Sequence, residues 1–289
     1  MALGFTTAPK PSPIVGDATT ANNTELILKI QLTLSFLSIA VNSFHLFILT
    51  RKPMRGTSVN VILTGIAICD IYDLIFLTYD DWDNLSDVDE ECIPSHSLIY
   101  LIIEHIAAIF EDNFHRLCIW LGVLMATIRY LSIKHALNPK FALLSKSTFA
   151  LKCILAIFLI SSSVTLFYWS HTKFEPIPPL DQCPNSSEVG YTKRMNKELV
   201  FRIFAFVDGS LKIIPSVILM PVLSVLLIKH LREAGKVNER ANHRKHEGPK
   251  TDQTTKLVLL MTLSSMLAEG PFGICYILNG LMDQNAVSS

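Results

Sequence analysis

The chain has 289 residues, of which 50% are hydrophobic and 17% are charged, and its formal net charge is zero. Soluble domains carry about 25% charged residues, so the composition argues against an ordinary soluble protein. The balanced charge gives no indication of a nucleic-acid partner. The distribution of charges along the chain is more informative than their sum.

Six apolar blocks are long enough to cross a bilayer, which takes about 20 helical residues. They occupy residues 26–49, 58–79, 107–133, 148–170, 200–228 and 255–278. No block alternates as a membrane strand does, and in lipid every backbone polar group needs an internal partner, so we expect helices. Residues 1–25 are predicted to form a tail outside the cell and residues 279–289 a short C-terminal tail.

The loop charges predict the orientation. Lys and Arg gather after the first, third and fifth blocks, whereas residues 80–106 contain neither and hold seven acids between Asp80 and Glu91. Since loops rich in Lys and Arg stay in the cytoplasm, the N-terminus is predicted to be extracellular. The three Asn-x-Ser/Thr sequons, at Asn22, Asn84 and Asn185, all fall on the predicted outer side, where glycosylation occurs.

Charged residues inside the predicted helices mark candidate sites, because they are costly in lipid. In the third block, Glu111 with His115 and Asp112 with Arg116 are each spaced to share a helix face, and in the fifth block Asp208 and Lys212 are also four apart and could neutralise each other. They could be a solvated helix top with internal ion pairs, or could line a water-filled outer pocket; a metal site at Glu111 and His115 would need further ligands. The predicted ligand contacts are Glu111, His115, Asp208, Lys212 and Glu269.

Two further polar features lie deeper. Asp70 in the second block and Asn42 in the first are predicted to form a polar core, with either a functional or a purely structural role. Arg129 lies 18 residues after Glu111, roughly 27 Å along a helix. It could face a cytosolic partner, or its side chain could simply reach the lipid headgroups.

Three segments carry a family pattern: HRLCIWLGVLMATIRYLSIKH, LKIIPSVILMPVLSVLLIKHLREA and TTKLVLLMTLSSMLAEGPFGICYIL. With LTGIAICD around Asp70, they resemble rhodopsin-like G-protein-coupled receptors, specifically nematode serpentine receptor class W, which is similar to FMRFamide-type neuropeptide receptors. The resemblance implies an all-α membrane protein with a rhodopsin-like transmembrane helix bundle. Only NGLMDQNAVSS follows Leu278, so we expect six of the seven helices, with the chain truncated before the seventh.

The resemblance also implies residue roles. Arg129 and Tyr130 stand where the family has the Arg and Tyr of its Asp-Arg-Tyr motif, which couples to the G protein, and Ile128 replaces the acid. The usual arginine–carboxylate restraint is therefore not predicted. Cys92 and Cys183 lie in the two predicted outer loops and match the family's disulfide; two unpaired thiols are the alternative.

The predicted function is a receptor of the plasma membrane. It would bind a neuropeptide or a chemosensory small molecule outside and engage a heterotrimeric G protein inside. No nucleophile–base pair, phosphate loop or metal motif is present, so no enzyme activity, cofactor or metal is expected. A truncated fragment that does not signal is one alternative. A multi-pass transporter is the other, and it would show internal repeats.

Overall fold

The computed structural model describes residues 18–52, 56–86, 97–135, 138–177, 190–195 and 198–241, with 263, 266, 267, 270, 271, 273–275, 277 and 278. Within these residues, five helices are long and apolar enough to cross a membrane. They cover Glu25–Leu49, Ser58–Asp83, Leu98–Lys134, Ser147–Trp169 and Leu199–His230. The described positions from 263 to 278 are helical and lie in the sixth predicted block. The prediction of a helical membrane protein is confirmed.

Four separate helices come first: α1 (Ala18–Leu49), α2 (Ser58–Ser86), α3 (Leu98–Lys134) and α4 (Ser147–Trp169). α1 and α3 begin eight and nine residues before the predicted positions 26 and 107. The α3 start follows from its N-cap, where the Ser97 hydroxyl accepts a hydrogen bond from the Tyr100 backbone N–H at 3.3 Å. With 37 residues, α3 is roughly 55 Å long and exceeds a hydrocarbon core of about 30 Å.

The fifth predicted block is one continuous helix in three parts: α5 (Glu198–Ile213), η3 (Ile214–Leu219) and α6 (Met220–Ala241). The middle part, η3, is a π-helix that contains Pro215. Proline has no N–H to donate to the preceding turn, and a π-segment is one of the ways in which a helix accommodates this. The Ser216 hydroxyl donates to the Lys212 carbonyl, one turn earlier on the same helix, as Ser side chains do where a helix bends.

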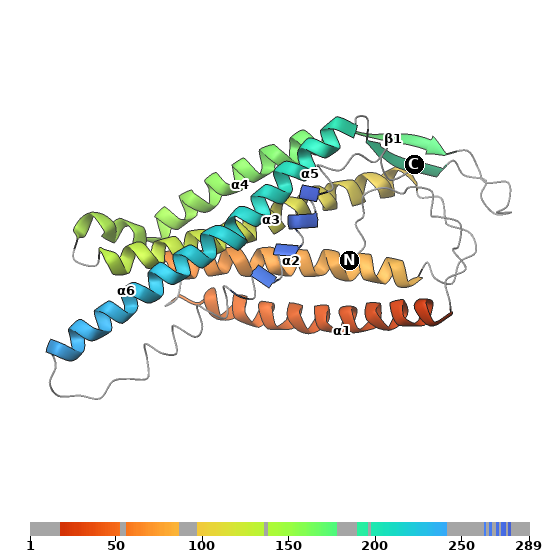
Figure 1. Cartoon of the computed structure of the whole chain (residues 1–289). Helices are drawn as coiled ribbons and strands as arrows, with labels where there is room; N and C mark the ends of the chain where they lie inside the picture. The colour runs from red at the N-terminus through yellow and green to blue at the C-terminus, as the bar shows by residue number, and fades with distance from the viewer. Residues whose placement is uncertain are drawn as a thin grey trace.

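The two ends of the bundle differ. At one end β1 (Thr172–Ile177) and β2 (Gly190–Met195) form an antiparallel hairpin (Figure 1). At the other lies the short helix η2 (Pro139–Ser145), beside an isolated bridge that joins Thr57 to Lys146. We call these the hairpin end and the η2 end.

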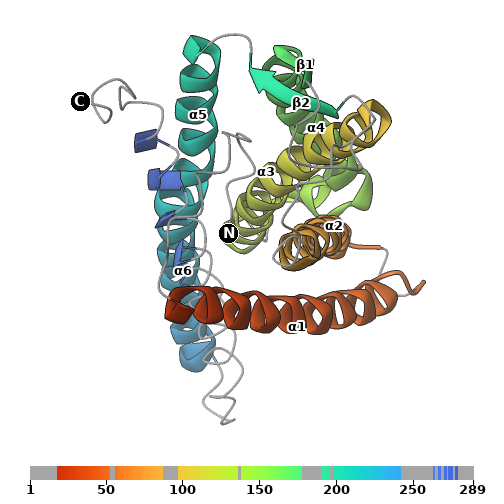
Figure 2. The ribbon, with the colours of Figure 1, turned by 90° about the vertical axis from the view of Figure 1, so that its right-hand side faces the viewer.

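The helix α3 is central, since it contacts α2, α4, α5 and α6, whereas α1 packs on α2 at the edge of the bundle (Figure 2). The main apolar core joins α2, α3 and α4 and consists of Ile62, Cys69, Leu117, Leu121, Met125, Ile128 and Ala150. Many large apolar side chains instead point away from the bundle, such as Leu155 and Leu159 on α4, which are 58% and 57% exposed. Such outward apolar faces are suited to lipid.

Candidate functional site

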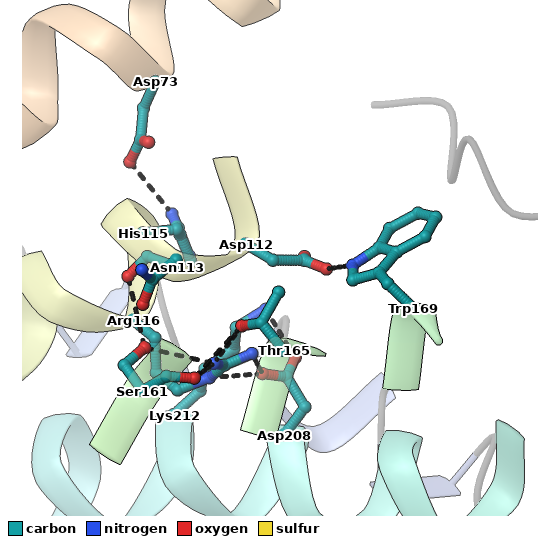
Figure 3. A network of polar contacts seen from close by, with 10 residues as sticks. All are labelled: Asp73, Asp112, Asn113, His115, Arg116, Ser161, Thr165, Trp169, Asp208 and Lys212. Atoms are coloured by element: carbon teal, nitrogen blue, oxygen red, sulfur yellow. Dashed lines mark hydrogen bonds and ion pairs between the residues drawn. The ribbon is translucent and has the colours of Figure 1, made fainter. Parts of the chain in front are cut away.

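Arg116 is the centre of a buried polar cluster in which α3, α4 and α5 meet (Figure 3). Its Nε donates to Oδ1 of Asp208 at 2.9 Å, and its Nη2 lies 2.8 Å from the same oxygen. Its Nη1 donates to the hydroxyls of Ser161 at 3.1 Å and Thr165 at 2.9 Å. Arg116 is 1% exposed, so these contacts replace its hydration. One side chain on α3 thus holds α4 and α5 at the same point.

Asp208 also pairs with a residue of its own helix. Nζ of Lys212 lies 2.8 Å from Oδ2 of Asp208, one turn along α5, and both side chains are at most 4% exposed. Each carboxylate oxygen therefore faces a different cation. The predicted i,i+4 pairing of Asp208 and Lys212 is confirmed, and Arg116 is added to it.

A second set of polar contacts ties α3 to α4. The Trp169 indole N–H donates to Oδ2 of Asp112 at 2.8 Å. One residue further along α3, the Asn113 amide donates to the Ser162 hydroxyl at 2.8 Å. Asp112 and Asn113 are both buried. The two helices are thereby fixed at consecutive residues next to the Arg116 cluster.

His115 points toward α2 instead. Its Nδ1 lies 3.3 Å from Oδ2 of Asp73, and both side chains are partly exposed. Glu111, one turn before His115, is half-buried, and within the described residues it makes no hydrogen bond or ion pair. Its charged neighbours are Asp112, His115, Asp73 and Lys212.

The predicted ligand contacts therefore divide into groups. Asp208 and Lys212 lie in the Arg116 cluster, His115 lies against α2, and Glu111 stands between them on α3. Glu269 is outside the described residues. The alternative of a solvated helix top is wrong for Asp112 and Arg116, because both are buried and Arg116 pairs across helices.

Sequence reasoning did not identify the partners that α4 supplies. Ser161, Thr165 and Trp169 are ordinary residues of an apolar helix in the sequence. The available signal was Arg116 itself, since a cation inside a membrane segment must find partners in the bundle. The rotation of α4 that brings these three toward α3 is not visible in a single sequence.

Asp70 has a partner on α3 that the sequence did not indicate. Oδ1 of Asp70 accepts a hydrogen bond from the Cys118 thiol at 3.1 Å. Asn42 makes no bond to Asp70 among the described residues, so their predicted network stays a prediction. Cys118 is therefore a hydrogen-bond donor as well as the small apolar filler that its type suggests.

At the η2 end, Tyr130 contacts the continuation of the fifth helix. Its ring centroid lies 5.4 Å from that of His230 on α6, and its hydroxyl accepts from Lys134 at 3.1 Å. Ile128, which occupies the place of the family's acid, is 2% exposed and belongs to the main core. Arg129 has no ion pair with any described residue.

The hairpin is fastened to the start of α3. Nζ of Lys193 on β2 lies 2.7 Å from Oε1 of Glu104. The adjacent His105 packs edge-on against Trp169 and Phe174, with ring centroids 4.7 and 5.3 Å away. Trp169 thus contacts the residues beneath the hairpin as well as Asp112.

Several predictions fall outside what the structure describes. Cys92, Cys183 and Asn185 are not among the described residues, so the disulfide and that glycosylation site stay predictions. Asn22 lies in the first turns of α1, and Asn84 in the last turn of α2. In the described part of the chain, Cys69, Cys118, Cys153 and Cys275 are unbridged. No three His, Cys, Asp or Glu side chains gather there as a metal site would require.

The Trp169–Asp112 bond gives a first test. Replacing Trp169 by Phe keeps a ring in place but leaves the buried Asp112 without the indole N–H donor. We expect the free energy of unfolding to fall by about 1–3 kcal/mol, measured by denaturant titration of the purified chain in detergent. The matched variant Trp82→Phe, at a tryptophan that is 61% exposed, is expected to change it by less than about 0.5 kcal/mol. If Trp169→Phe and Trp82→Phe changed the free energy of unfolding equally, the Trp169–Asp112 hydrogen bond would not stabilise the chain as assigned.

Comparison with known proteins agrees with this architecture. Residues 29–289 match the family model described as serpentine type 7TM GPCR chemoreceptor Srw. The chain is also similar to a Caenorhabditis elegans protein, G-protein coupled receptor dmsr-1, with 22% identity over 88% of this chain. The chain spans 58% of the length of that relative. Because the family match covers most of the sequence, the chain belongs to the Srw family of serpentine G-protein-coupled chemoreceptors.

Proposed function

We propose that this chain is a receptor that transmits ligand binding at its hairpin end to a heterotrimeric G protein at its η2 end. The observation that carries the proposal is the division of charge along α3. Glu111 lies in the half of α3 toward the hairpin end, Arg116 lies near its middle, and Arg129 with Tyr130 lies at the η2 end. A single helix thus joins the proposed ligand region to the proposed G-protein region. The chain's membership of a receptor family supports this assignment of the two ends.

The proposed orientation places the hairpin end outside the cell, in the plasma membrane. Basic residues at the η2 end support it, including Arg51, Lys134, Lys146 and Lys229. The tail before α1 would be extracellular, and the η2 end would face the cytoplasm.

The proposed ligand is a peptide or small molecule with a cationic group. In the Arg116 cluster, Asp208 faces Arg116 and Lys212. Outside it, Asp73 on α2 faces His115 on α3. Asp112 is buried and accepts a hydrogen bond from Trp169, whereas Glu111 is half-buried and has neither a hydrogen bond nor an ion pair among the described residues. A half-buried carboxylate without a cation of its own is suited to hold an amine or a guanidinium. His115 and Glu269 are proposed as further contacts, whereas Asp208 and Lys212 would act on the ligand mainly through the charge of their cluster.

On the cytoplasmic side, Arg129 and Tyr130 are proposed to engage the G protein. Arg129 is half-buried and has no ion pair among the described residues, so its guanidinium is available to a partner. The helix η2 lies close by and presents Leu143, which is 59% exposed.

The test is nucleotide exchange by heterotrimeric G protein mixed with the full chain in lipid nanodiscs. A library of cationic peptides and amines is applied, and binding of a non-hydrolysable GTP analogue is followed. For a compound that stimulates exchange, Glu111→Gln is expected to weaken binding about 10- to 100-fold, as for a lost charged hydrogen bond of about 1.5–3 kcal/mol. Arg129→Ala is expected to keep binding and lose exchange.

The control for Glu111 is Glu25→Gln, which neutralises an exposed acid at the outer part of α1 and is expected to leave binding unchanged. Equal binding of a cationic ligand to wild type and Glu111→Gln would reject the ligand assignment. Failure of every compound and every G-protein class to give exchange would reject the receptor activity itself.

A further inference from the structure

The Arg116–Asp208 pair joins two residues that are 92 positions apart in sequence. Arg116 lies on α3 and Asp208 on α5, both side chains are 1% exposed, and Nη2 and Nε of Arg116 lie 2.8 and 2.9 Å from the carboxylate. The Ser161 and Thr165 hydroxyls hold the same guanidinium from α4. The pair is thus a point of attachment between three helices.

This attachment resists movement of α5 away from α3. A buried ion pair tolerates little separation, because each charge that loses its partner is left without water in a low-dielectric interior. Lys212 binds the same carboxylate from the helix that carries Asp208, so that ion pair does not itself join two helices. The Arg116–Asp208 pair does cross from α3 to α5.

Directly beyond the attachment lies a deformable part of the same helix. The π-segment η3 begins at Ile214, six residues after Asp208, and contains Pro215. Segments of this kind are common places for a helix to bend. Past η3, α6 runs on to the η2 end, where His230 contacts Tyr130 of α3 at 5.4 Å between ring centroids. Contacts with α3 thus lie on both sides of η3, at Asp208 and at His230.

From this geometry we infer that the Arg116–Asp208 pair is the restraint that keeps α3 and α6 together at the η2 end and holds the chain in a non-signalling conformation. At the η2 end itself, Ile128 is buried in the core, and Arg129 has no ion pair with a described residue. The ionic restraint thus lies in the middle of the bundle. The statement that the pair holds the chain in a non-signalling conformation rests on the proposed function. The statement that it keeps α3 and α6 together does not.

The test compares two substitutions that each neutralise one buried acid. Asp208→Asn breaks the ion pair between helices, whereas Asp112→Asn keeps an acceptor oxygen for Trp169 and leaves the Arg116–Asp208 pair intact. Basal nucleotide exchange without ligand is expected to rise about five- to tenfold in Asp208→Asn, as for a minor state first populated at a few per cent. In Asp112→Asn it is expected to stay within about twofold of wild type. Equal basal exchange in the two variants would overturn the inference.

A structural readout separates this inference from the receptor proposal. Spin labels on non-canonical amino acids at the exposed positions Thr148 and Glu233 report the distance between the η2 ends of α4 and α6 in nanodiscs. Asp208→Asn is expected to change the mean distance by about 2 Å or more, and Asp112→Asn to leave it unchanged. If no variant supports exchange with any ligand, the proposed function fails and the distance alone decides: a change supports the restraint, and no change overturns it.

A triple variant separates loss of the restraint from poor folding. Arg116→Met with Asp208→Leu and Lys212→Met removes the three charges of the cluster together, so none of these ions is left in the core without its partner. We expect it to fold like wild type and to show the altered Thr148–Glu233 distance of Asp208→Asn. A well-folded triple variant with the wild-type distance would overturn the inference.

Discussion

Replacing Arg116 by Ala is expected to lower the free energy of unfolding by about 3–5 kcal/mol, the usual cost of removing one partner of a buried ion pair. Arg116 is 1% exposed and donates to Asp208, Ser161 and Thr165. Its loss leaves these acceptors buried without their donor, and it removes the contact that joins α3, α4 and α5. Denaturant titration of the purified chain in detergent measures the effect.

The control for Arg116 is a pair on the surface of the same protein. Lys29 pairs with Glu25 on α1, where the side chains are 56% and 41% exposed. Lys29→Ala is expected to cost at most about 1 kcal/mol, because exposed ion pairs contribute little. If Arg116→Ala were as mild as Lys29→Ala, the cluster would not hold the three helices together.

Gly209→Ala is expected to destabilise the chain by about 1–3 kcal/mol, the usual range for overpacking. A methyl group at Gly209 would lie 2.9 Å from the Gly273 carbonyl oxygen and from the backbone nitrogen of Ile277. Backbone atoms cannot rotate away as a side chain can, so α5 and the helical residues around Gly273 would have to separate. The contact is one residue from Asp208, so the strain falls beside the Arg116 cluster.

Gly56→Ala is the matched control, because an added methyl group there meets no atom within 4 Å. It is expected to change the free energy of unfolding by less than about 0.5 kcal/mol. Equal thermal stability of the two variants would contradict the close approach of α5 to Gly273.

The helices were predictable because their signal is local. A run of apolar residues as long as Thr148–Ser170 has few options in lipid besides a helix, and α4 occupies Ser147–Trp169. The prediction began α3 at residue 107, because Glu104 and His105 interrupt the apolar run before it. The helix itself continues through these polar residues back to Leu98. Its beginning is set by the Ser97 cap, a feature that is weaker in sequence than apolar length.

The site was predictable only in part, for a geometric reason. Spacing within one helix identified Asp208 with Lys212, since residues four apart share a face whatever the rest of the fold. The same rule paired Asp112 with Arg116, but each bonds across helices, to Trp169 and to Asp208. Contacts between helices depend on how each helix is rotated in the bundle, and apolar blocks that face lipid and core alike carry little information about rotation.

The measurement that tests the central claim most directly is ligand-stimulated nucleotide exchange in sealed vesicles of one orientation. The full chain is reconstituted with G protein at the face bearing Arg129, and a stimulating compound is added either to the hairpin side or to the vesicle interior. Our account predicts exchange only when a membrane-impermeant compound reaches the hairpin side. Equal exchange from either side, or the absence of exchange with every compound while the chain remains folded, would contradict it.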